Sequence, residues 1–479
     1  MAGTNHYALT PDRQERVDSW GMNRATLSYV YRPTTAEQVV EAFALARSSG
    51  KTAALRGTGC SYGDASLNNE GIVIDLTRMN RILDWNPQTG LITVQPGVTI
   101  RQLWQYIIED GWWPPVVSGT MFVTLGGAAG MNIHGKNNFK AGPIGNHITE
   151  FEIVTPGGDV KVCSRNENSE LFHAAIGGFG MLGVFTRLTV QMKKIYSGQL
   201  KVDAFATKSF ADIIEKFSER IDGADYLVGW IDCFATGSEL GRGQVHQANY
   251  LTPEDDPDPA QGLRVANQEL PDTLMGIFPK SLMWRILQPF NNNLGMKAVN
   301  LAKYTQSATI GNNETVNQSH AQFAFLLDYV PNWKFAYKPG GLVQFQSFVP
   351  YDAAEHVFSE QLRLSHKFGI IPYLGVFKRH RPDDFLMTHA VDGFSFALDY
   401  PWTESNKDGV RTLAQVMTRI VLDAGGRHYF AKDSLLTAGA AQEYLGSEAI
   451  SKFKALKSKY DPNHILQSDL SRRLFGAFS

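Results

Sequence analysis

Four glycine-rich loops within residues 56–147 are the feature that most constrains the fold of this chain. They read RGTGCSYGD (56–64), SGTMFVTLGG (118–127), NIHGKN (132–137) and AGPIGNH (141–147). Glycine allows positive φ and lets successive backbone N–H groups approach a ligand. A sharp turn explains any single loop, but four in one region favour a site that binds an anion, such as a diphosphate. Because no basic cluster lies beside them, we expect backbone N–H groups to do the binding.

Regular elements surround these loops. Apolar positions between Thr35 and Gly50 follow helical spacing, and Gln38 is expected to complete a capping box with Thr35. Short apolar runs at residues 52–56, 71–76, 81–85 and 91–97 predict strands, and residues 99–111 predict a second helix. The mixture of helices and strands with short connections predicts an α+β fold.

Residues 112–145 are rich in glycine and lack regular periodicity. Such a long irregular stretch in a compact region is typical of a functional segment. Strands are expected again at 148–156 and 160–164, then a helix at 169–176 and a strand from Val184. One compact unit is therefore predicted to end near Ser197.

The sequence GFGMLG at 178–183 matches the dinucleotide fingerprint GxGxxG, with Asp203 about twenty residues further on. That fingerprint must follow a strand and open a helix. Here a helical pattern precedes it and an alternating strand pattern follows. We therefore interpret it as a tight turn, and not as a nicotinamide site.

Composition limits the classes of function. A chain of 479 residues predicts two to four domains, and a net charge of −2 argues against bulk nucleic-acid binding. The three cysteines are scattered, and CxxC and HExxH are absent, so neither a disulfide framework nor a metal site is expected. The N-terminus lacks an apolar signal core, and no stretch is long enough to span a bilayer. These features predict a cytoplasmic protein, with peripheral membrane contact left open.

Residues 199–426 are more aromatic, with an acidic loop at 252–262 and a polar stretch at 305–320. These two stretches flank IFPKSLMWRIL at 277–287. Two interpretations of 252–320 stay open: a lid over a site, or a loosely packed excursion of the chain.

The first 195 or so residues resemble the FAD-binding domain of the vanillyl-alcohol-oxidase type flavoproteins. Within that family the chain is most similar to the oxidases of polyprenylphosphoryl pentoses. The resemblance runs nearly end to end, because its motifs occur in the same order and at similar spacing: RGTGCSYGD, SGTMFVTLGG, NIHGKNN, GNH, ELFHAAIGGFGMLG, LVQFQ, GVFKR, ALDYP, AKDS and DPNHILQSDLSRRL.

The resemblance implies a two-domain vanillyl-alcohol-oxidase type fold with an inserted antiparallel-sheet substrate domain. Residues 1–198 would form the FAD-binding domain and 199–426 the substrate domain. The C-terminal segment, 427–479, would return to the FAD-binding domain.

The resemblance also implies that FAD is the cofactor, held noncovalently. The expected cofactor-binding residues belong to the glycine-rich loops, the turn before the strand at 184 and the tail: Arg56, Gly57, Thr58, Gly59, Cys60, Ser61, Tyr62, Gly119, Thr120, Thr124, Gly126, Gly127, Asn132, His134, Gly135, Asn137, Gly142, Gly145, Asn146, Gly183, Val184 and Tyr429. Cys60 stands where covalent relatives place a flavin-linked histidine. A cysteinyl link is chemically possible for a thiolate, but the resemblance implies that FAD is not linked.

Three residues match the family's catalytic positions: Lys432, Tyr62 and His134. Hydride would pass from the substrate to flavin N5, while Lys432 hydrogen-bonds flavin and substrate hydroxyl and His134 orients the hydroxyl or relays its proton. The substrate would be bound by Gln344, Gln346, Lys378, Ser395 and Lys432. Gln344 and Gln346 alternate by two, so on a strand they share one face, opposite Phe345.

Three positions depart from the pattern of the resembling oxidases. Ala397 replaces a pocket cysteine that covalent nitroaromatic inhibitors attack, Ser395 replaces an asparagine, and Ala324 replaces a pocket tyrosine. The flavin end of the site is thus retained while the far pocket is altered, which weakens the prediction of that specific lipid-linked substrate.

The expected reaction is oxidation of a secondary hydroxyl of a sugar, such as a polyprenylphosphoryl pentose, to a 2'-keto product. A short-chain reductase would complete an epimerisation, and quinone or oxygen would accept the electrons. The alternatives are an aldonolactone or alditol oxidase, a sterol side-chain reductase, which the missing membrane anchor disfavours, and a catalytically silent flavin-binding protein.

Overall fold

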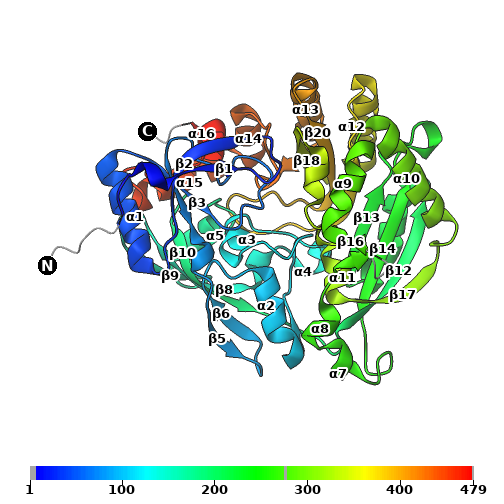
Figure 1. The fold of residues 1–479 in the computed structure, drawn as a ribbon, viewed down its shortest axis with the longest axis horizontal. Helices are drawn as coiled ribbons and strands as arrows, with labels where there is room; N and C mark the ends of the chain where they lie inside the picture. The colour runs from blue at the N-terminus through cyan, green and yellow to red at the C-terminus, as the bar shows by residue number, and fades with distance from the viewer. Residues whose placement is uncertain (1–6, 275–277, 477–479) are drawn as a thin grey trace.

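The computed structural model describes residues 7–274 and 278–476 (Figure 1). The first six and last three residues of the predicted FAD-binding unit lie outside these ranges, as does Ile277 of the segment predicted at 277–287.

The first sheet has the strand order β1-β2-β4-β3 and is parallel except where β1 meets β2. Its strands are β1 (Gln14–Asp18), β2 (Ala25–Tyr31), β3 (Ala53–Arg56) and β4 (Ile72–Asp75). Helix α1 (Ala36–Ser49) packs on it through buried apolar residues that include Val39 and Phe43. The predicted helix bounds are confirmed, since Thr35 caps the N-terminus and Gly50 ends the helix in the left-handed region.

The capping box predicted for α1 is wrong in one detail. The Thr35 hydroxyl accepts the Gln38 N–H at 3.4 Å, as expected. The Gln38 side chain, however, accepts the N–H of Thr34 at 2.7 Å instead of that of Thr35. Because the chain enters the helix from Thr34, the amide oxygen reaches that earlier donor.

A second, five-stranded antiparallel sheet follows in the order β5-β6-β10-β8-β9. It contains β5 (Ile82–Asn86), β6 (Leu91–Val94), β8 (Ile148–Val154), β9 (Val160–Ser164) and β10 (Val184–Gln191). Helices α2 (Ile100–Ile107) and α5 (Ser169–Ala175) accompany it. The sequence at 178–183 joins α5 to β10, so its interpretation as a turn between a helix and an antiparallel strand is confirmed.

The irregular stretch predicted at 112–145 contains only short elements. They are β7 (Trp112–Trp113), which pairs with β11 (Lys193–Lys194), α3 (Leu125–Gly130) and α4 (Asn138–Ala141). The chain between these elements runs past the cavity described below.

An eight-stranded sheet, called the large sheet here, is antiparallel throughout. Its strands, in spatial order, are β17 (Glu314–Ser319), β12 (Gln199–Thr207), β14 (Gly243–Tyr250), β13 (Tyr226–Ile231), β19 (Leu374–His380), β20 (Gly393–Trp402), β18 (Gly341–Pro350) and β21 (Arg427–His428). Helices α6 (Phe210–Arg220), α12 (Ala354–Phe368) and α13 (Lys407–Asp423) bury apolar side chains against one face, including Phe345 of β18. The opposite face carries Gln344 and Gln346 and borders the cavity.

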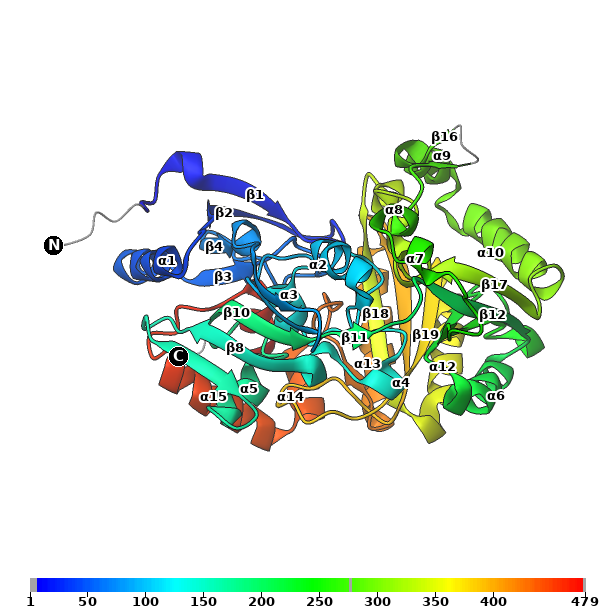
Figure 2. The same cartoon turned by 90° about the horizontal axis from the view of Figure 1, so that it is seen from below.

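The tail crosses back to the first two sheets. Its helices are α14 (Ala438–Leu445), α15 (Ser447–Tyr460) and α16 (Asp469–Phe475). They lie with the first two sheets at the left of Figure 1, and Figure 2 shows α14 and α15 near α5, on the side of the first two sheets away from β1. Leu466 forms a parallel bridge with Ala53, and the Arg473 guanidinium donates to both oxygens of the buried Asp64 carboxylate at 2.7 and 2.8 Å. We call the first sheets and this tail the first lobe (residues 7–198 and 429–476). The large sheet begins with β12, directly after β11 of the first lobe. The arrangement of the chain as two domains stays a prediction.

The segment 252–320 carries helices α7 (Pro259–Gly262), α8 (Val265–Gln268), α9 (Met283–Leu287) and α10 (Asn293–Ala308). Its first part is fixed, because the buried Gln268 amide donates to the carbonyl oxygens of Gly198 and Gly262 at 2.6 and 2.9 Å. Helix α10 packs over β12 and β14. A lid function for this segment stays a prediction. Within the described ranges, none of the helices combines the length and the apolar character needed to cross a membrane.

Candidate active site

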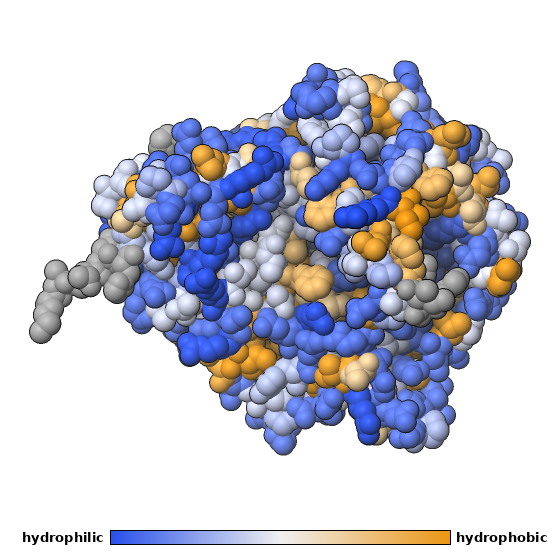
Figure 3. Space-filling view, in the orientation of Figure 1, coloured by the Kyte–Doolittle hydropathy of each residue, from blue (hydrophilic) through white to orange (hydrophobic). Residues whose placement is uncertain are grey.

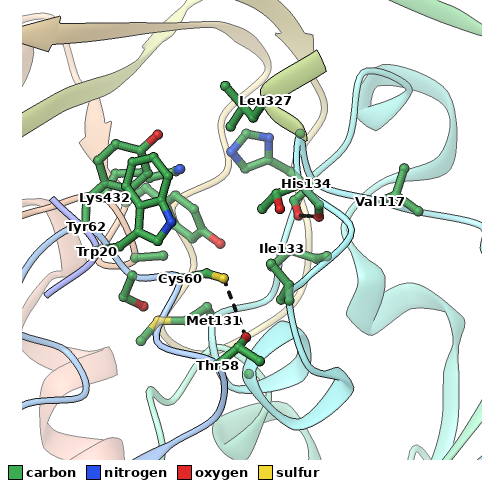
Figure 4. A pocket seen from close by; sticks show the side chains of 18 of the residues that line it. Trp20, Thr58, Cys60, Tyr62, Val117, Met131, Ile133, His134, Leu327 and Lys432 are labelled. Atoms are coloured by element: carbon green, nitrogen blue, oxygen red, sulfur yellow. Dashed lines mark hydrogen bonds between the residues drawn. The ribbon is translucent and has the colours of Figure 1, made fainter. Parts of the chain in front are cut away.

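A cavity of about 600 Å³ lies where the first lobe meets the large sheet. Its wall combines the glycine-rich loops, the cavity-facing strands of the large sheet and the tail around Lys432 (Figure 4). Residues such as Leu55 and Phe179 line it within the first lobe, and Lys378 and Gln344 line it on the large sheet. The cavity therefore joins the two parts of the molecule.

The first glycine-rich loop presents backbone donors to this cavity. Among the described residues, the N–H groups of residues 57–61 have no hydrogen-bond acceptor. Gly59 has φ +72°, and a Cβ there would lie 2.2 Å from the Arg56 guanidinium; a Cβ on Gly57 would lie 2.2 Å from Thr124 Oγ1. Arg56 is itself fixed by hydrogen bonds to Ser66 Oγ and the Asp18 carbonyl oxygen. The loop is thus a close-fitting cradle of unpaired N–H groups.

The second loop, at 118–127, is held beside the first. Thr58 Oγ1 donates to the Phe122 carbonyl oxygen at 2.6 Å. The Asp328 carboxylate, from the segment after α11 (His320–Ala324), accepts the Met121 N–H at 2.7 Å and the Thr120 hydroxyl at 2.8 Å. Burial raises the pKa of Asp328 to about 6. Within the described ranges, the N–H groups of Gly119 and Thr120 have no acceptor, so both loops offer free donors.

These features fit FAD. Its diphosphate needs hydrogen-bond donors that approach closely, and successive N–H groups on glycine loops supply them. The cavity wall also carries five basic side chains, while no Asp or Glu lines it in the described ranges. The five are Arg56, Lys136, Lys303, Lys378 and Lys432. An anionic occupant is therefore favoured along the whole cavity.

Lys432, Tyr62 and Asp399 form one buried cluster at the junction. The Lys432 ammonium lies over the Tyr62 ring, and Trp20 packs on the same ring with 4.5 Å between ring centroids (Figure 4). Burial lowers the pKa of Lys432 to about 7, although the Asp399 carboxylate acts in the opposite direction. Burial raises the pKa of Asp399, while the Gln344 amide, which donates to it at 2.5 Å, lowers it. Lys432 can therefore exchange a proton near neutral pH.

His134 belongs to a second buried cluster. Its Nε2 accepts a hydrogen bond from the Gln346 amide at 3.2 Å, and its ring lies 4.9 Å from that of His380 and 5.2 Å from that of Tyr429. Burial lowers the pKa of His134 well below its ordinary value, and Lys378 lowers it further. His134 is therefore neutral, and its Nδ1 has no partner among the described residues.

Three lysines stand at the large-sheet end of the cavity. Lys136 Nζ donates to the Phe323 carbonyl oxygen and lies 4.2 Å from the centroid of the Phe323 ring. Lys303 Nζ lies 4.1 Å from a ring centroid of Trp230. Burial lowers the pKa of Lys378 to about 8. A ligand with a negative charge at this end would meet all three.

Most of the predicted site residues line the cavity. They are Arg56, Gly57, Thr58, Gly59, Cys60, Ser61, Tyr62, Gly119, Thr120, Thr124, Gly126, Gly127, His134, Gly183, Gln344, Gln346, Lys378, Tyr429 and Lys432. Ala324 and Ala397 line it as well.

Eight predicted residues are not part of the cavity wall, and their role in binding stays a prediction. They are Asn132, Gly135, Asn137, Gly142, Gly145, Asn146, Val184 and Ser395. Asn132 Oδ1 accepts the Gly145 N–H at 3.0 Å, and the Asn137 amide donates to the Pro115 carbonyl oxygen at 2.8 Å, so both hold loops in shape. Ser395 lies behind the wall, hydrogen-bonded to His380 at 2.7 Å and to Gln346 at 3.4 Å.

Several lining or supporting residues were not predicted. Lys136 directly follows the His134–Gly135 pair and could have been found from that motif. Asp399 alternates with Ser395 and Ala397 on β20, which places it on the same face. Lys303 and Asp328 carry no such signal, because long-range packing alone brings them to the site.

Cys60 lines the cavity close to Thr58, with 3.5 Å between its sulfur and the Thr58 hydroxyl oxygen (Figure 4). Burial raises the pKa of its thiol. Because the thiolate is the reactive form of cysteine, this environment disfavours nucleophilic attack by Cys60.

Comparison with known proteins adds independent evidence. The sequence model of the family described as FAD binding domain matches residues 27–164. The chain is 31% identical over 473 residues to decaprenylphosphoryl-β-D-ribose oxidase of Mycolicibacterium smegmatis, which covers 97% of this chain and 98% of that protein. L-Gulonolactone oxidase of Bos taurus is 30% identical over 197 residues, covering 41% of this chain and 44% of its own. Cytokinin dehydrogenase 9 of Oryza sativa subsp. japonica is 30% identical over 207 residues, covering 41% of this chain and 38% of its own.

Proposed function

We propose that this chain, which belongs to the family of FAD-dependent oxidoreductases that includes decaprenylphosphoryl-β-D-ribose oxidase, oxidises a secondary hydroxyl group of a phosphoryl-linked sugar. The similarity extends over almost the whole length of both proteins. A lipid-linked pentose phosphate is accordingly the substrate class that we propose, with a 2'-keto sugar as the product.

The observation that carries this proposal is the charge of the cavity wall. Lys136, Lys303 and Lys378 stand at the large-sheet end, and no carboxylate lines the wall within the described residues. A phosphoryl group is the part of such a substrate that lysines bind best, since ammonium groups make charge-assisted hydrogen bonds to phosphate oxygens. A neutral lactone or alditol would offer these lysines no anionic partner, which disfavours the aldonolactone oxidase alternative.

FAD, when bound, supplies the oxidising power of the site by taking up hydride at N5 of its ring. We propose that the free N–H groups of 57–61 and of Gly119 and Thr120 hold its diphosphate. The flavin ring would then extend toward Tyr62, where the tail and the large sheet meet.

The residues of the junction would handle the proton. Lys432, with a pKa lowered to about 7, is the group proposed to accept the proton of the substrate hydroxyl while the carbon loses hydride. Tyr62, whose hydroxyl has no partner among the described residues, would donate a hydrogen bond on the substrate side of the flavin, and neutral His134, held by Gln346, would orient the substrate hydroxyl through its free Nδ1. Gln344 and Gln346 would bind further sugar hydroxyls from the same strand face.

The reaction leaves a reduced cofactor and a ketone. We propose that a quinone or oxygen reoxidises the cofactor. A short-chain reductase that reduces the ketone from the opposite side would complete an epimerisation.

The test is anaerobic reduction of the FAD-loaded protein by a short-chain polyprenylphosphoryl pentose, measured as the loss of flavin absorbance (bleaching). Wild-type protein should bleach, and Lys432→Ala should slow bleaching by at least 100-fold, because general acid-base groups contribute about 10²- to 10⁴-fold. Lys454→Ala, a change of an exposed lysine on α15, is the matched control. Equal rates for Lys432→Ala and wild type would remove the role of Lys432. No bleaching of wild-type protein by this substrate, with bleaching by a free lactone or alditol, would overturn the substrate class.

A further inference from the structure

Exposed apolar side chains gather on one short segment, residues 278–313. Leu282, Ile286 and Phe290 recur every fourth residue from the turn before α9 to the turn after it, and Leu294 and Leu301 continue on α10. Leu294 is 81% exposed and Ile310 is 80% exposed. Figure 3 shows hydrophobic side chains clustered over the region where Figure 1 draws α9 and α10. In Figure 2, α9 projects from the outer edge of the molecule, next to α10.

Helix α10 has an inverted polarity. Its buried residues are the polar Asn300 and Ser307, which face the large sheet, while Leu294 and Leu301 face outward. A helix that packs on a protein core and otherwise meets water shows the reverse pattern. The outward face is therefore suited to an apolar environment and not to bulk solvent.

The charge of the same segment has one sign. It contains Lys280, Arg285, Lys297 and Lys303, and no Asp or Glu between Phe278 and Asn313. Arg285 and Lys297 are exposed. Lys338 is exposed as well and is brought beside the segment, because the Gln288 amide donates to its carbonyl oxygen at 3.0 Å. Carboxylates that approach the segment, such as Asp272 beside Lys280, come from outside it.

The segment also borders the cavity. Lys303 of α10 lines the cavity wall, although Leu301, two residues earlier, is exposed. Leu326 both lines the cavity and is more than half exposed. A molecule held on the outer face of the segment would thus lie close to the large-sheet end of the cavity.

We propose that the outer face of residues 278–313 docks on the surface of an anionic lipid bilayer. Apolar side chains that alternate with exposed Lys and Arg, on a helix with few other charges, match the pattern of helices that lie in a membrane interface. Anionic headgroups supply the complement to Arg285, Lys297 and Lys338. Docking itself needs no substrate, but its link to catalysis rests on the proposed function: docking would bring a lipid-linked sugar phosphate to the lysines of the cavity.

The test is co-sedimentation of the FAD-loaded protein with vesicles of phosphatidylglycerol and phosphatidylcholine. Wild-type protein should bind the mixed vesicles, bind pure phosphatidylcholine far more weakly, and lose affinity as salt rises. The double variant Arg285→Gln/Lys297→Gln should bind about twentyfold more weakly, since each cation near an anionic surface contributes about fivefold. Ile286→Ser/Leu294→Ser should lose at least tenfold, because its apolar contacts are removed.

Matched controls carry the same changes elsewhere. Leu83→Ser/Val160→Ser removes two exposed apolar side chains from the first lobe, and Arg411→Gln/Lys452→Gln removes two exposed cations. Both should bind vesicles as wild type does. No binding of wild-type protein to anionic vesicles, or equal losses in the test and control variants, would overturn the proposal. It would also be overturned if sedimentation without lipid showed a dimer that only Ile286→Ser/Leu294→Ser abolishes, since a second copy would then cover this face.

A further arm separates this proposal from the proposed function. Ile286→Ser/Leu294→Ser should oxidise a short, water-soluble polyprenylphosphoryl pentose as fast as wild type, but a long-chain substrate in vesicles at least tenfold more slowly. Vesicle binding without oxidation of either substrate would uphold the docking surface and remove the proposed substrate. Oxidation of both substrates at wild-type rates by the variant would overturn the docking proposal and leave the enzymatic activity in place.

Discussion

The Nζ atom of Lys432 lies 3.7 Å from the centroid of the Tyr62 ring, although the two residues are far apart in the sequence. The first glycine-rich loop supplies Tyr62 and the tail supplies Lys432. The backbone joins them as well, because the Tyr62 N–H donates to the Ala431 carbonyl oxygen at 2.9 Å. A proton-accepting lysine is thus fixed against the loop that is proposed to hold the cofactor.

The pH dependence of kcat/KM should report on Lys432. The pKa of this lysine is about 7, and only its neutral form can accept a proton, so kcat/KM should rise with pH through about 7. Asp399 raises this pKa; Asp399→Asn should therefore move the rising limb to lower pH by about one unit. Asp423→Asn, an exposed carboxylate paired with Arg419, should leave the profile unchanged. If the rising limb of the kcat/KM profile stays at the same pH in Asp399→Asn, the assignment of this limb to Lys432 is contradicted.

Substitution of Gly59 should weaken FAD binding through a collision. A Cβ at this position meets the Arg56 guanidinium, and φ is +72°. Gly59→Ala should therefore lower FAD affinity at least tenfold, measured by flavin fluorescence on titration of the apoprotein. Gly50 has a similar φ of +66°, but no atom of the described residues lies within 4 Å of a Cβ placed there. Gly50→Ala should cost about 1 kcal/mol of unfolding free energy and leave FAD affinity unchanged; equal effects of the two changes on FAD would argue against the cradle.

Cys60 should not be linked to the cofactor. Burial raises the pKa of its thiol, so the thiolate needed to form the bond is scarce at neutral pH. Precipitation of the purified protein with acid should release all of its FAD into the supernatant, for wild type and for Cys60→Ser alike. Flavin that stays with the wild-type precipitate and leaves it in Cys60→Ser would show a covalent link.

Lys378 should recognise the phosphoryl group of the substrate. Lys378→Met should raise KM for a phosphorylated sugar substrate by about tenfold, because a hydrogen bond to a charged group contributes about 1.5 kcal/mol or more. The corresponding sugar without phosphate should show no change in KM. A similar loss for both substrates would mean that Lys378 supports the cavity without contacting phosphate.

Much of this arrangement could be predicted from local patterns. Helix α1, the strands of the first two sheets and the alternation of Gln344 and Gln346 follow from periodicity and caps, which depend on neighbouring residues. The glycine-rich loops identified the cavity for a similar reason, because positive φ and close approach are local requirements. Sequence alone did not separate the residues between 132 and 146 that line the cavity from those that lie outside its wall. A glycine or asparagine that shapes a loop looks the same in sequence as one that meets a ligand.

Other parts of the site depend on contacts between distant segments. Asp328 supports the second loop across more than 200 residues of sequence, and Lys303 reaches the cavity only because α10 packs over β12 and β14. The shielding of Ser395 by His380 and Gln346 depends on how three strands pair. Neither periodicity nor motif spacing carries this information.

The bond between Arg473 and Asp64 has a consequence for the order in which the protein can mature. Asp64 ends the first glycine-rich loop, and its carboxylate is fully buried against a guanidinium from α16. During synthesis residue 473 leaves the ribosome after the strands of the large sheet, so the large sheet can form while Asp64 is paired only with Arg24 and still lacks Arg473. Nascent chains should therefore acquire FAD only after α16 has been synthesised and has docked, and a stop codon that removes α16 should yield a protein with a folded large sheet and no yellow colour.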